Sequence, residues 1–336
     1  MKRSIGLAAA VAGFAVAGLV TERTVVRRVR GREDAERDQL FVVPGDVSHH
    51  EMPSYDGGRL HVIQRGRGRP LVLLHGVTLT AEIWAPQLHQ LADRYRLIAC
   101  DLRGHGNSEV GRDGFGLDHI GHDVATVLEH LDLRDAIVVG HSMGGMALMR
   151  FCGDHTDVLD ERVAGLGFVA TSATLPTPAI VVGRTQRLAD HLVRRAEAGR
   201  PVRSYRFGES DLSWLLCRLA FGRRAPAAAV EQVRAMIAAV PPEVLHPCSA
   251  GILLHDGTDA LRATHTPSFV VVGALDLLTP PFASRRIAEL LPGTELHVLA
   301  GAGHQLMQER PDELAALIDA LVARLEKAEA PVVPVP

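Results

Sequence analysis

The chain has 336 residues and is poor in aromatic side chains, in excess charge of one sign and in metal-ligand patterns. Aromatic residues make up 4% of the chain, which is little material for stacking on nucleic-acid bases or long sugars. The 36 Lys and Arg are offset by 39 Asp and Glu, and the net charge of −3 predicts no nucleic-acid partner. The 17 histidines follow no metal-binding spacing, so no metal is expected.

The sequence also lacks paired cysteines and a phosphate-binding loop. Its four cysteines, at positions 100, 152, 217 and 248, form no CxxC pair, and we expect buried, reduced thiols. The glycine-rich stretch at 66–70 precedes a predicted strand instead of following one, so it is no dinucleotide fingerprint and no cofactor is predicted. The hydrophobic fraction of 47% and the charged fraction of 22% are those of a globular protein. They exclude a disordered chain, a collagen-like repeat and a multi-span membrane protein.

Charge is distributed unevenly between the N-terminal arm and the rest of the chain. Residues 1–32 carry seven cationic side chains and one acidic side chain, a local charge of +6, which leaves −9 for the remainder. Within this arm, residues 5–20 form an apolar run of 16 residues. As a helix the run would be about 24 Å long, shorter than the ~30 Å hydrocarbon core of a bilayer. Flanking arginines extend its reach, because their long side chains can direct the charge toward water.

Three interpretations of the arm stay open: a signal peptide, a single membrane anchor, or an apolar helix that packs on the body. The sequence Ala15-Val16-Ala17 matches the A-x-A pattern of a signal-peptide cleavage site. Five arginines follow the run and two cations precede it, a bias that holds the large C-terminal part in the cytoplasm and disfavours export. We therefore expect membrane association through residues 1–30 on the cytoplasmic side, or a cytoplasmic protein. The sequence does not indicate the oligomeric state.

From residue 54 onward, short apolar runs alternate with helical patterns. A DG turn between extended runs predicts a hairpin near residues 54–66. Strands are predicted at 70–74, 96–100, 136–139, 269–272 and 296–299, and helices at 124–131 and 311–325. This alternation indicates an α/β protein with a mostly parallel sheet and helices on both faces.

The alternation stops between about residues 173 and 262, where helices are expected at 185–198, 211–219 and 227–240. A helical insertion inside an α/β domain is typically a lid over the site. The expected organisation is an arm and linker at 1–50, core at 51–172, helical lid at 173–262, core again at 263–327 and a disordered tail at 328–336.

The strongest chemical motif is Gly140-His141-Ser142-Met143-Gly144, which follows a predicted buried strand and precedes a helical stretch. G-x-S-x-G in this context is a nucleophile elbow. The turn is tight, and side chains at positions 140 and 144 would collide with neighbouring backbone. The turn therefore presents the Ser142 hydroxyl at the carboxyl edge of the sheet, where the positive end of the following helix points.

Four segments of the chain resemble the α/β-hydrolase superfamily, and specifically its lid-bearing serine esterase/lipase-like branch. They occur in the family's order: Leu73-Leu74-His75-Gly76, then 101–108 (DLRGHGNS), then the elbow, then Gly273-Ala274-Leu275-Asp276 with Gly301-Ala302-Gly303-His304. The resemblance covers about residues 54–325. It implies the α/β-hydrolase fold, with a mostly parallel eight-stranded sheet, helices on both faces and a helical lid insertion.

The resemblance implies a triad of Ser142, Asp276 and His304. A neutral serine is a poor nucleophile and needs an adjacent base, so His304 would take its proton and return it to the leaving alkoxide. Asp276 would hold the imidazole in the required tautomer and stabilise its protonated form. The chain order Ser, Asp, His is the order that this fold imposes.

The transition state needs two preorganised donors, and the backbone N–H groups of Val77 and Met143 are expected to supply this oxyanion hole. His75 and His141 flank the site, and together with Trp84 and Trp214 they are the expected substrate-binding residues. The predicted lid is rich in leucine, which favours an aliphatic pocket for an uncharged or lipid-like acyl chain.

The sequence therefore predicts a serine hydrolase that cleaves small-molecule carboxylic esters through an acyl-enzyme. Two alternatives use the same triad, namely a cofactor-free perhydrolase of the haloperoxidase kind and a C–C bond hydrolase. A third alternative is a non-catalytic ligand receptor on this fold. Serine at position 142 disfavours the epoxide hydrolase and haloalkane dehalogenase reactions, which use a carboxylate there.

Overall fold

The computed structural model describes residues 38–174 and 211–329. The apolar run at 5–20 and the helix expected at 185–198 lie outside the described residues. So does the expected tail from residue 330 onward, whereas residues 328 and 329 belong to the last helix.

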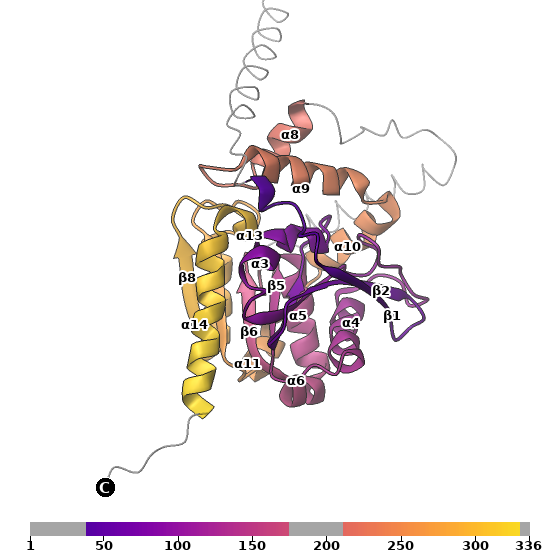
Figure 1. Ribbon diagram of the computed structural model, residues 1–336, viewed down its shortest axis with the longest axis vertical. Helices are drawn as coiled ribbons and strands as arrows, with labels where there is room; N and C mark the ends of the chain where they lie inside the picture. Colours follow the sequence, from indigo (N-terminus) through magenta and orange to yellow (C-terminus); the bar gives the residue numbers. More distant parts are fainter. Residues whose placement is uncertain (1–37, 175–210, 330–336) are drawn as a thin grey trace, which may run out of the picture.

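A mostly parallel sheet of eight strands forms the centre of the molecule, in the order β1-β2-β4-β3-β5-β6-β7-β8 (Figure 1). β1 and β2 pair antiparallel, β2 pairs antiparallel with β4, and the strands from β4 to β8 in this order are parallel. The strands are β1 Ser48–Pro53, β2 Arg59–Arg65, β3 Arg69–Leu74, β4 Tyr95–Cys100, β5 Ala136–His141, β6 Val163–Val169, β7 Ser268–Gly273 and β8 Glu295–Leu299. The predicted fold class is confirmed. β6 was not predicted, because its two glycines weaken the apolar pattern of the strand.

The N-terminal hairpin begins earlier than its sequence pattern suggests. β1 starts at Ser48, inside the stretch 1–50 that we expected to be arm and linker. The turn of the hairpin is closed by the Ser54 N–H, which donates to the Gly58 carbonyl at 2.8 Å. Phe41 is also packed into the core, 5% exposed. The end of the expected linker is therefore part of the folded body.

Alternate residues of the buried strands face two separate hydrophobic layers. Val72 and Leu74 of β3 pack into one layer, and Leu71 and Leu73 pack into the other. Because side chains alternate across a strand, a continuous apolar run serves both faces of the sheet. The first layer is covered by α4 Leu117–His130, α5 Met143–Asp154, α6 Thr156–Arg162, α11 Thr258–Ala263 and α12 Pro281–Leu290. The second is covered by η1 Ala81–Trp84, α3 Ala85–Gln90, α13 Leu306–Glu309 and α14 Pro311–Glu329.

Between β6 and β7 the described chain is helical. The helices expected at 211–219 and 227–240 are observed as α8 Asp211–Arg218 and α9 Ala227–Ala239. They lie together at one end of the molecule (Figure 1). We call α8, α9 and the connecting residues 219–226 the cap. A further helix, α10 Pro242–Leu253, follows it and was not predicted; Pro242 occupies its first position, where a missing N–H costs nothing.

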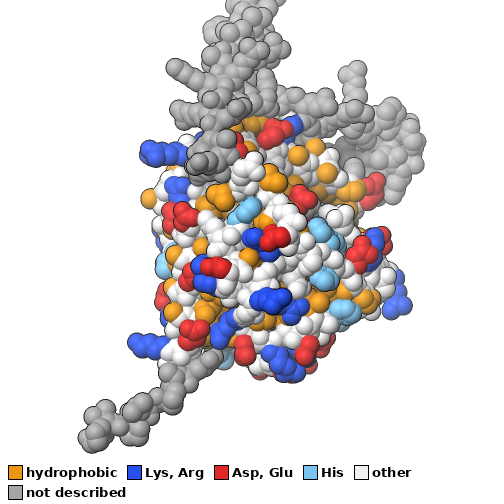
Figure 2. All heavy atoms as spheres, in the orientation of Figure 1, with side chains coloured by type: hydrophobic (Ala, Val, Ile, Leu, Met, Phe, Trp, Pro, Cys, Tyr) orange, Lys and Arg blue, Asp and Glu red, His pale blue; other side chains and the backbone are white. Residues whose placement is uncertain are grey.

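Among the described residues, no single helix is long and apolar enough to cross a membrane. Only α9 and α10 taken together pass the length and composition test, and they are bent by 93° at their break. All four cysteines, Cys100, Cys152, Cys217 and Cys248, are buried and free. On the face that Figure 2 shows, acidic and basic side chains are interspersed.

A buried ion-pair network fixes the loop after β4. The Arg103 guanidinium is fully buried and pairs with Asp123 at 2.7 Å and with Asp56 at 3.1 Å. It also donates to the Gly114 carbonyl at 2.8 Å. Burial disfavours the Asp56 carboxylate, but Arg103 outweighs it and lowers the pKa of Asp56 to about 2. The stability that this pairing contributes is complete above pH ~4 and is lost as the pH falls toward 2.

Replacing Arg103 by Met should lower the free energy of unfolding by about 3–5 kcal/mol, because it leaves two carboxylates buried without their cation. Arg59 offers a matched control, since it also pairs with two carboxylates but lies 42% exposed. Arg59→Met should cost less than about 1 kcal/mol. Urea denaturation followed by circular dichroism measures both. Equal losses for the two variants would contradict this role of Arg103.

Candidate active site

The serine of the G-x-S-x-G motif lies on a strained turn between β5 and α5. Ser142 has φ 52° and ψ −117°, a positive-φ conformation that non-glycine residues rarely adopt. Its carbonyl accepts hydrogen bonds from the N–H groups of Gly145 and Met146 and, at 2.7 Å, from the Thr171 hydroxyl. These bonds hold the turn, and strain of this kind typically marks a functional residue.

The glycines around Ser142 are required by close backbone contacts. A Cβ at Gly140 would lie 2.6 Å from the Gly144 carbonyl oxygen, and one at Gly144 would lie 2.6 Å from the carbonyl oxygens of Leu74 and His75. As predicted from the sequence, a side chain at either position would collide with neighbouring backbone. The missing side chain at Gly140 allows the turn to fold back on itself, and the missing side chain at Gly144 allows the elbow to approach the end of β3.

The acidic residue follows β7, at the same carboxyl edge of the sheet. Asp276 is buried, and its Oδ1 accepts the N–H groups of Leu278 at 2.8 Å and Thr279 at 2.9 Å. Its Oδ2 accepts the Thr279 hydroxyl at 2.9 Å and His304 Nδ1 at 2.8 Å. Burial opposes ionisation, but His304 and the Thr279 donors outweigh it, so the pKa of Asp276 lies below its ordinary value. Asp276 is therefore a carboxylate that orients the histidine.

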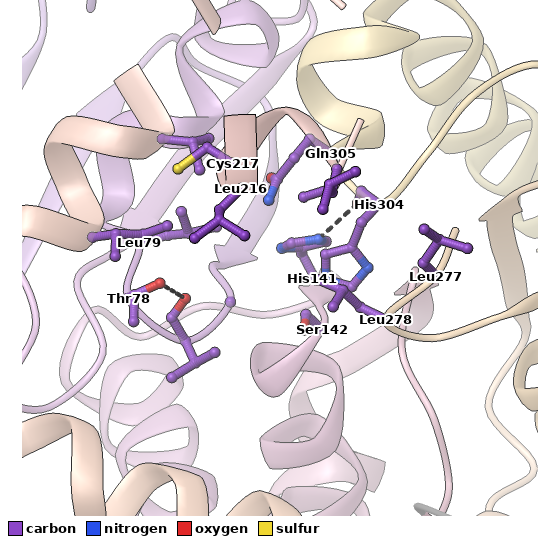
Figure 3. Close-up of a pocket in the computed structure, with 16 residues that line it drawn as sticks. Thr78, Leu79, His141, Ser142, Leu216, Cys217, Leu277, Leu278, His304 and Gln305 are labelled. Carbon is purple, nitrogen blue, oxygen red and sulfur yellow. Dashed lines mark hydrogen bonds between the residues drawn. The ribbon is translucent and has the colours of Figure 1, made fainter. Parts of the chain in front are cut away.

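His304 is held through its side chain and through both backbone groups. Besides the Asp276 contact, its N–H donates to the Ala220 carbonyl at 2.7 Å. Its carbonyl accepts from His141 Nε2 at 3.0 Å (Figure 3). Burial and the nearby His304 ring lower the pKa of His141 well below its usual value, so His141 is a neutral donor. With Nδ1 bound to Asp276, the other ring nitrogen of His304 is available as a base.

Ser142 and His304 line one pocket, and the predicted oxyanion residues lie beside it. Val77 lines the pocket, and Met143 is the first residue of α5, directly after Ser142. Among the hydrogen bonds of the described residues, neither the Val77 N–H nor the Met143 N–H has a protein acceptor. The adjacent Thr78 has φ 64°, which turns this loop sharply. Two free N–H groups near the serine are the donors that a developing oxyanion needs.

The pocket has a volume of about 390 Å³ and is mainly apolar. The described residues that line it include no Asp, Glu, Lys or Arg. Its apolar wall comes from the loop after β3, from the cap and from the loop after Asp276 (Figure 3). The wall residues are Leu79, Leu216, Leu219, Val233, Ile237, Leu277 and Leu278.

Of the four residues expected to bind substrate, the structure places only His141 in the pocket lining. Trp84 and Trp214 are 0% and 1% exposed and belong to the hydrophobic layer of α3 and α14. His75 is fully buried, where its Nδ1 donates to the Gly76 carbonyl at 2.7 Å and its Nε2 accepts the Leu102 N–H at 3.0 Å. Burial lowers the pKa of His75 to about 3, which makes it a neutral brace between two loops.

Sequence reasoning missed several pocket residues, notably Leu79, Val233, Ile237 and Gln305. The first three are ordinary aliphatic residues whose sequence context does not distinguish packing from pocket lining. Gln305 directly follows the predicted histidine, and its position next to His304 was the one available signal. Among the described residues, no group of three His, Cys, Asp or Glu is placed to hold a metal ion.

An eight-stranded sheet with a serine elbow after a central strand and an Asp–His pair at the same edge defines an α/β hydrolase. Residues 69–311 match the model of the alpha/beta hydrolase fold family, and the chain belongs to that family.

Similar proteins include both esterases and haloperoxidases. Non-heme chloroperoxidase CPO-A1 of Kitasatospora aureofaciens is 29% identical over 266 residues, which span 74% of this chain and 90% of that protein. Pimeloyl-(acyl-carrier protein) methyl ester esterase of Stenotrophomonas maltophilia is 29% identical over 279 residues, which span 80% of this chain and 99% of that protein. A solved thermophilic esterase from Thermogutta terrifontis has a TM-score of 0.69 and 26% identity, covering 83% of this chain and 99% of its own.

Gly144→Ala tests the geometry of the elbow. The added methyl group would overlap two carbonyl oxygens, so we expect a displaced Ser142 and a melting temperature lowered by several degrees. Gly45→Ala is the control, since no atom lies within 4 Å of a Cβ built there. Thermal unfolding measures both variants, and an unchanged melting temperature for Gly144→Ala would show that the turn has room to spare.

Proposed function

We propose that the protein is a serine hydrolase that cleaves carboxylic esters through an acyl-enzyme formed on Ser142. The observation that carries this proposal is the placement of Ser142 and His304 in one pocket, with His304 oriented by Asp276 at 2.8 Å. The relatives that are named as esterases support the same reaction class.

The first half of the reaction is acylation. The Ser142 hydroxyl attacks the ester carbonyl carbon while His304 takes its proton. Negative charge develops on the carbonyl oxygen, where the N–H groups of Val77 and Met143 stabilise it. The tetrahedral intermediate collapses with cleavage of the C–O bond, and His304 returns the proton to the leaving alkoxide. The products of this half are an alcohol and an acyl-Ser142 ester.

The second half releases the acid. Water enters beside His304, which takes a proton from it as the oxygen attacks the acyl carbonyl. The same two N–H groups stabilise the second oxyanion, and the proton returns to the Ser142 oxygen as the acyl bond breaks. Asp276 stays ionised throughout, and its lowered pKa supports this role.

The pocket supports an uncharged, aliphatic acyl group. Its wall carries leucine, valine and isoleucine side chains, and the described lining residues include no Asp, Glu, Lys or Arg. Transfer of an aliphatic chain from water into such a wall is favourable by about 0.8 kcal/mol per buried CH₂ group. A charged acyl group would lose its hydration there without gaining a partner.

A second candidate reaction uses the same acyl-enzyme with hydrogen peroxide in place of water as the acceptor. Attack by peroxide would release a peracid, which in turn oxidises halide. The specific observation in its favour is the similarity to a non-heme chloroperoxidase over 74% of this chain. The two reactions differ only in the second half, because acylation of Ser142 is common to both.

Ser142→Ala should lower the kcat for p-nitrophenyl butyrate by about four orders of magnitude or more, because the acyl-enzyme cannot form. Peroxide-dependent bromination in the presence of acetate should disappear together with esterase activity if both share the acyl-enzyme. Unchanged ester turnover in folded Ser142→Ala would refute the proposed nucleophile. Wild-type halogenation without ester hydrolysis would favour the second reaction.

Ile237→Trp tests the acyl side of the pocket. Ile237 on α9 lines the cavity, and a larger side chain there takes volume that a long acyl chain needs. We expect kcat/KM for p-nitrophenyl octanoate to fall at least tenfold while that for the acetate changes less than about threefold. Val42→Trp serves as the control, because Val42 is 59% exposed and does not line the pocket. A uniform loss for all chain lengths would place the acyl chain elsewhere.

A further inference from the structure

The cap and the loop that carries His304 are joined backbone to backbone. The His304 N–H donates to the Ala220 carbonyl at 2.7 Å, and the Arg223 N–H donates to the Gly301 carbonyl at 2.9 Å. Residues 219–226 connect α8 and α9, so these bonds join the cap to His304 itself and to Gly301 of the same loop.

Two glycines make this contact as close as it is. A Cβ at Gly222 would lie 2.1 Å from the Gly301 carbonyl oxygen, and a Cβ at Gly303 would lie 2.5 Å from the Gly222 nitrogen. Neither position has room for a side chain. The two segments therefore fit in a single relative placement, and a shift of either one would disturb the other.

Glu309 on α13 bridges the same two segments. Its Oε2 accepts the Gly222 N–H at 2.6 Å, and its Oε1 accepts the Gly303 N–H at 2.9 Å. The residue is 3% exposed. Burial raises the pKa of Glu309, and the N–H groups that it accepts oppose this effect. Burying a carboxylate costs desolvation free energy, so an apolar side chain would fill this space more favourably. The contacts of Glu309 with the cap and with the residue before His304 therefore indicate a specific role.

We propose that Glu309 is a positioning residue that couples the cap to His304, so that the histidine is correctly placed at Ser142 only while the cap is seated. This inference rests on the proposed function. The cap also supplies Leu216, Cys217 and Leu219 to the pocket wall. A substrate that fills the pocket therefore stabilises the seated cap and, through Glu309, the catalytic position of His304.

The first test is Glu309→Gln. Glutamine keeps the size of the side chain but turns an NH₂ group toward one of the two N–H donors, which breaks one side of the bridge. We expect kcat for p-nitrophenyl butyrate to fall about 10²-fold with KM changed less than about threefold, because small misplacement of a catalytic group is costly. Glu309→Asp, which keeps the charge but shortens its reach, should recover part of the kcat.

Gln308→Leu is the matched control. Gln308 lies on the same short helix, is fully buried, and its Nε2 donates to Gln232 Oε1 of α9 at 2.6 Å. Its side-chain hydrogen bond therefore goes to the cap, whereas its hydrogen bond to the histidine loop is made by the backbone N–H, which donates to the Gln305 carbonyl at 3.0 Å and is kept in Gln308→Leu. We expect Gln308→Leu to lower the melting temperature while kcat stays within about threefold. A kcat loss equal to that of Glu309→Gln would overturn the proposal, because any weakening of the cap would then suffice.

Hydrogen–deuterium exchange separates failure of the coupling from failure of the proposed function. In Glu309→Gln, exchange should rise together in peptides spanning 219–223 and 301–305, whereas in Gln308→Leu it should rise at most in the cap. Faster exchange in only one segment of Glu309→Gln overturns the coupling, whatever the activity. The joint rise in Glu309→Gln supports the coupling even if the wild-type protein neither hydrolyses esters nor reacts with a fluorophosphonate at Ser142. That inactivity of the wild type would refute the proposed function alone.

Gly222→Ala perturbs the same contact from the cap side. Its methyl group would push against the Gly301 carbonyl, so kcat should fall in this variant as well. Both changes disrupt the same contact between the cap and the His304 loop. The fold-loss of kcat in the double variant with Glu309→Gln should therefore be smaller than the product of the two single fold-losses. Multiplicative losses would show that the two residues act independently and would overturn the proposal.

Discussion

The backbone turn at Ser142 is the constraint on which the rest of the site depends. A residue other than glycine at φ 52° costs of order 1–3 kcal/mol, so the surroundings must over-determine the turn. They do so through Gly140 and Gly144, which permit contact with neighbouring backbone, and through the Thr171 hydroxyl on the Ser142 carbonyl. The same turn starts α5, whose first N–H groups then point toward the serine.

The other parts of the site are arranged around this fixed point on separate loops. Asp276 follows β7 and accepts hydrogen bonds from the N–H and hydroxyl of Thr279. His304 follows β8 and is held through its ring, its N–H and its carbonyl. His141, immediately before Ser142, donates to the His304 carbonyl, so the elbow itself supports the base. The residue next to the nucleophile is thereby hydrogen-bonded to the backbone of the base, and this link needs no substrate.

Much of this could be predicted from the sequence, because the motifs that carry the chemistry are local. The elbow and the Asp276 and His304 loops each occupy a few consecutive residues, and β3, β4 and β7 each contain a run of at least four apolar residues. The residues that line the pocket were harder to predict from the sequence. Trp84 and Trp214 were expected at the substrate and lie in the core, because a large apolar side chain satisfies either environment equally well. The Glu309 bridge could not be predicted, because Glu309 lies 87 positions from Gly222 and accepts a backbone N–H there, a contact that no side-chain pattern in the sequence indicates.

The proposed reaction proceeds through a covalent acyl-Ser142 intermediate. The most direct measurement is mass spectrometry of the protein quenched in acid within milliseconds of mixing with p-nitrophenyl butyrate, followed by peptide mapping. We expect a mass increase of one butyryl group, located on the peptide that contains Ser142. Ester turnover with a burst of p-nitrophenol but no adduct, or with the adduct on another residue, would contradict acylation of Ser142.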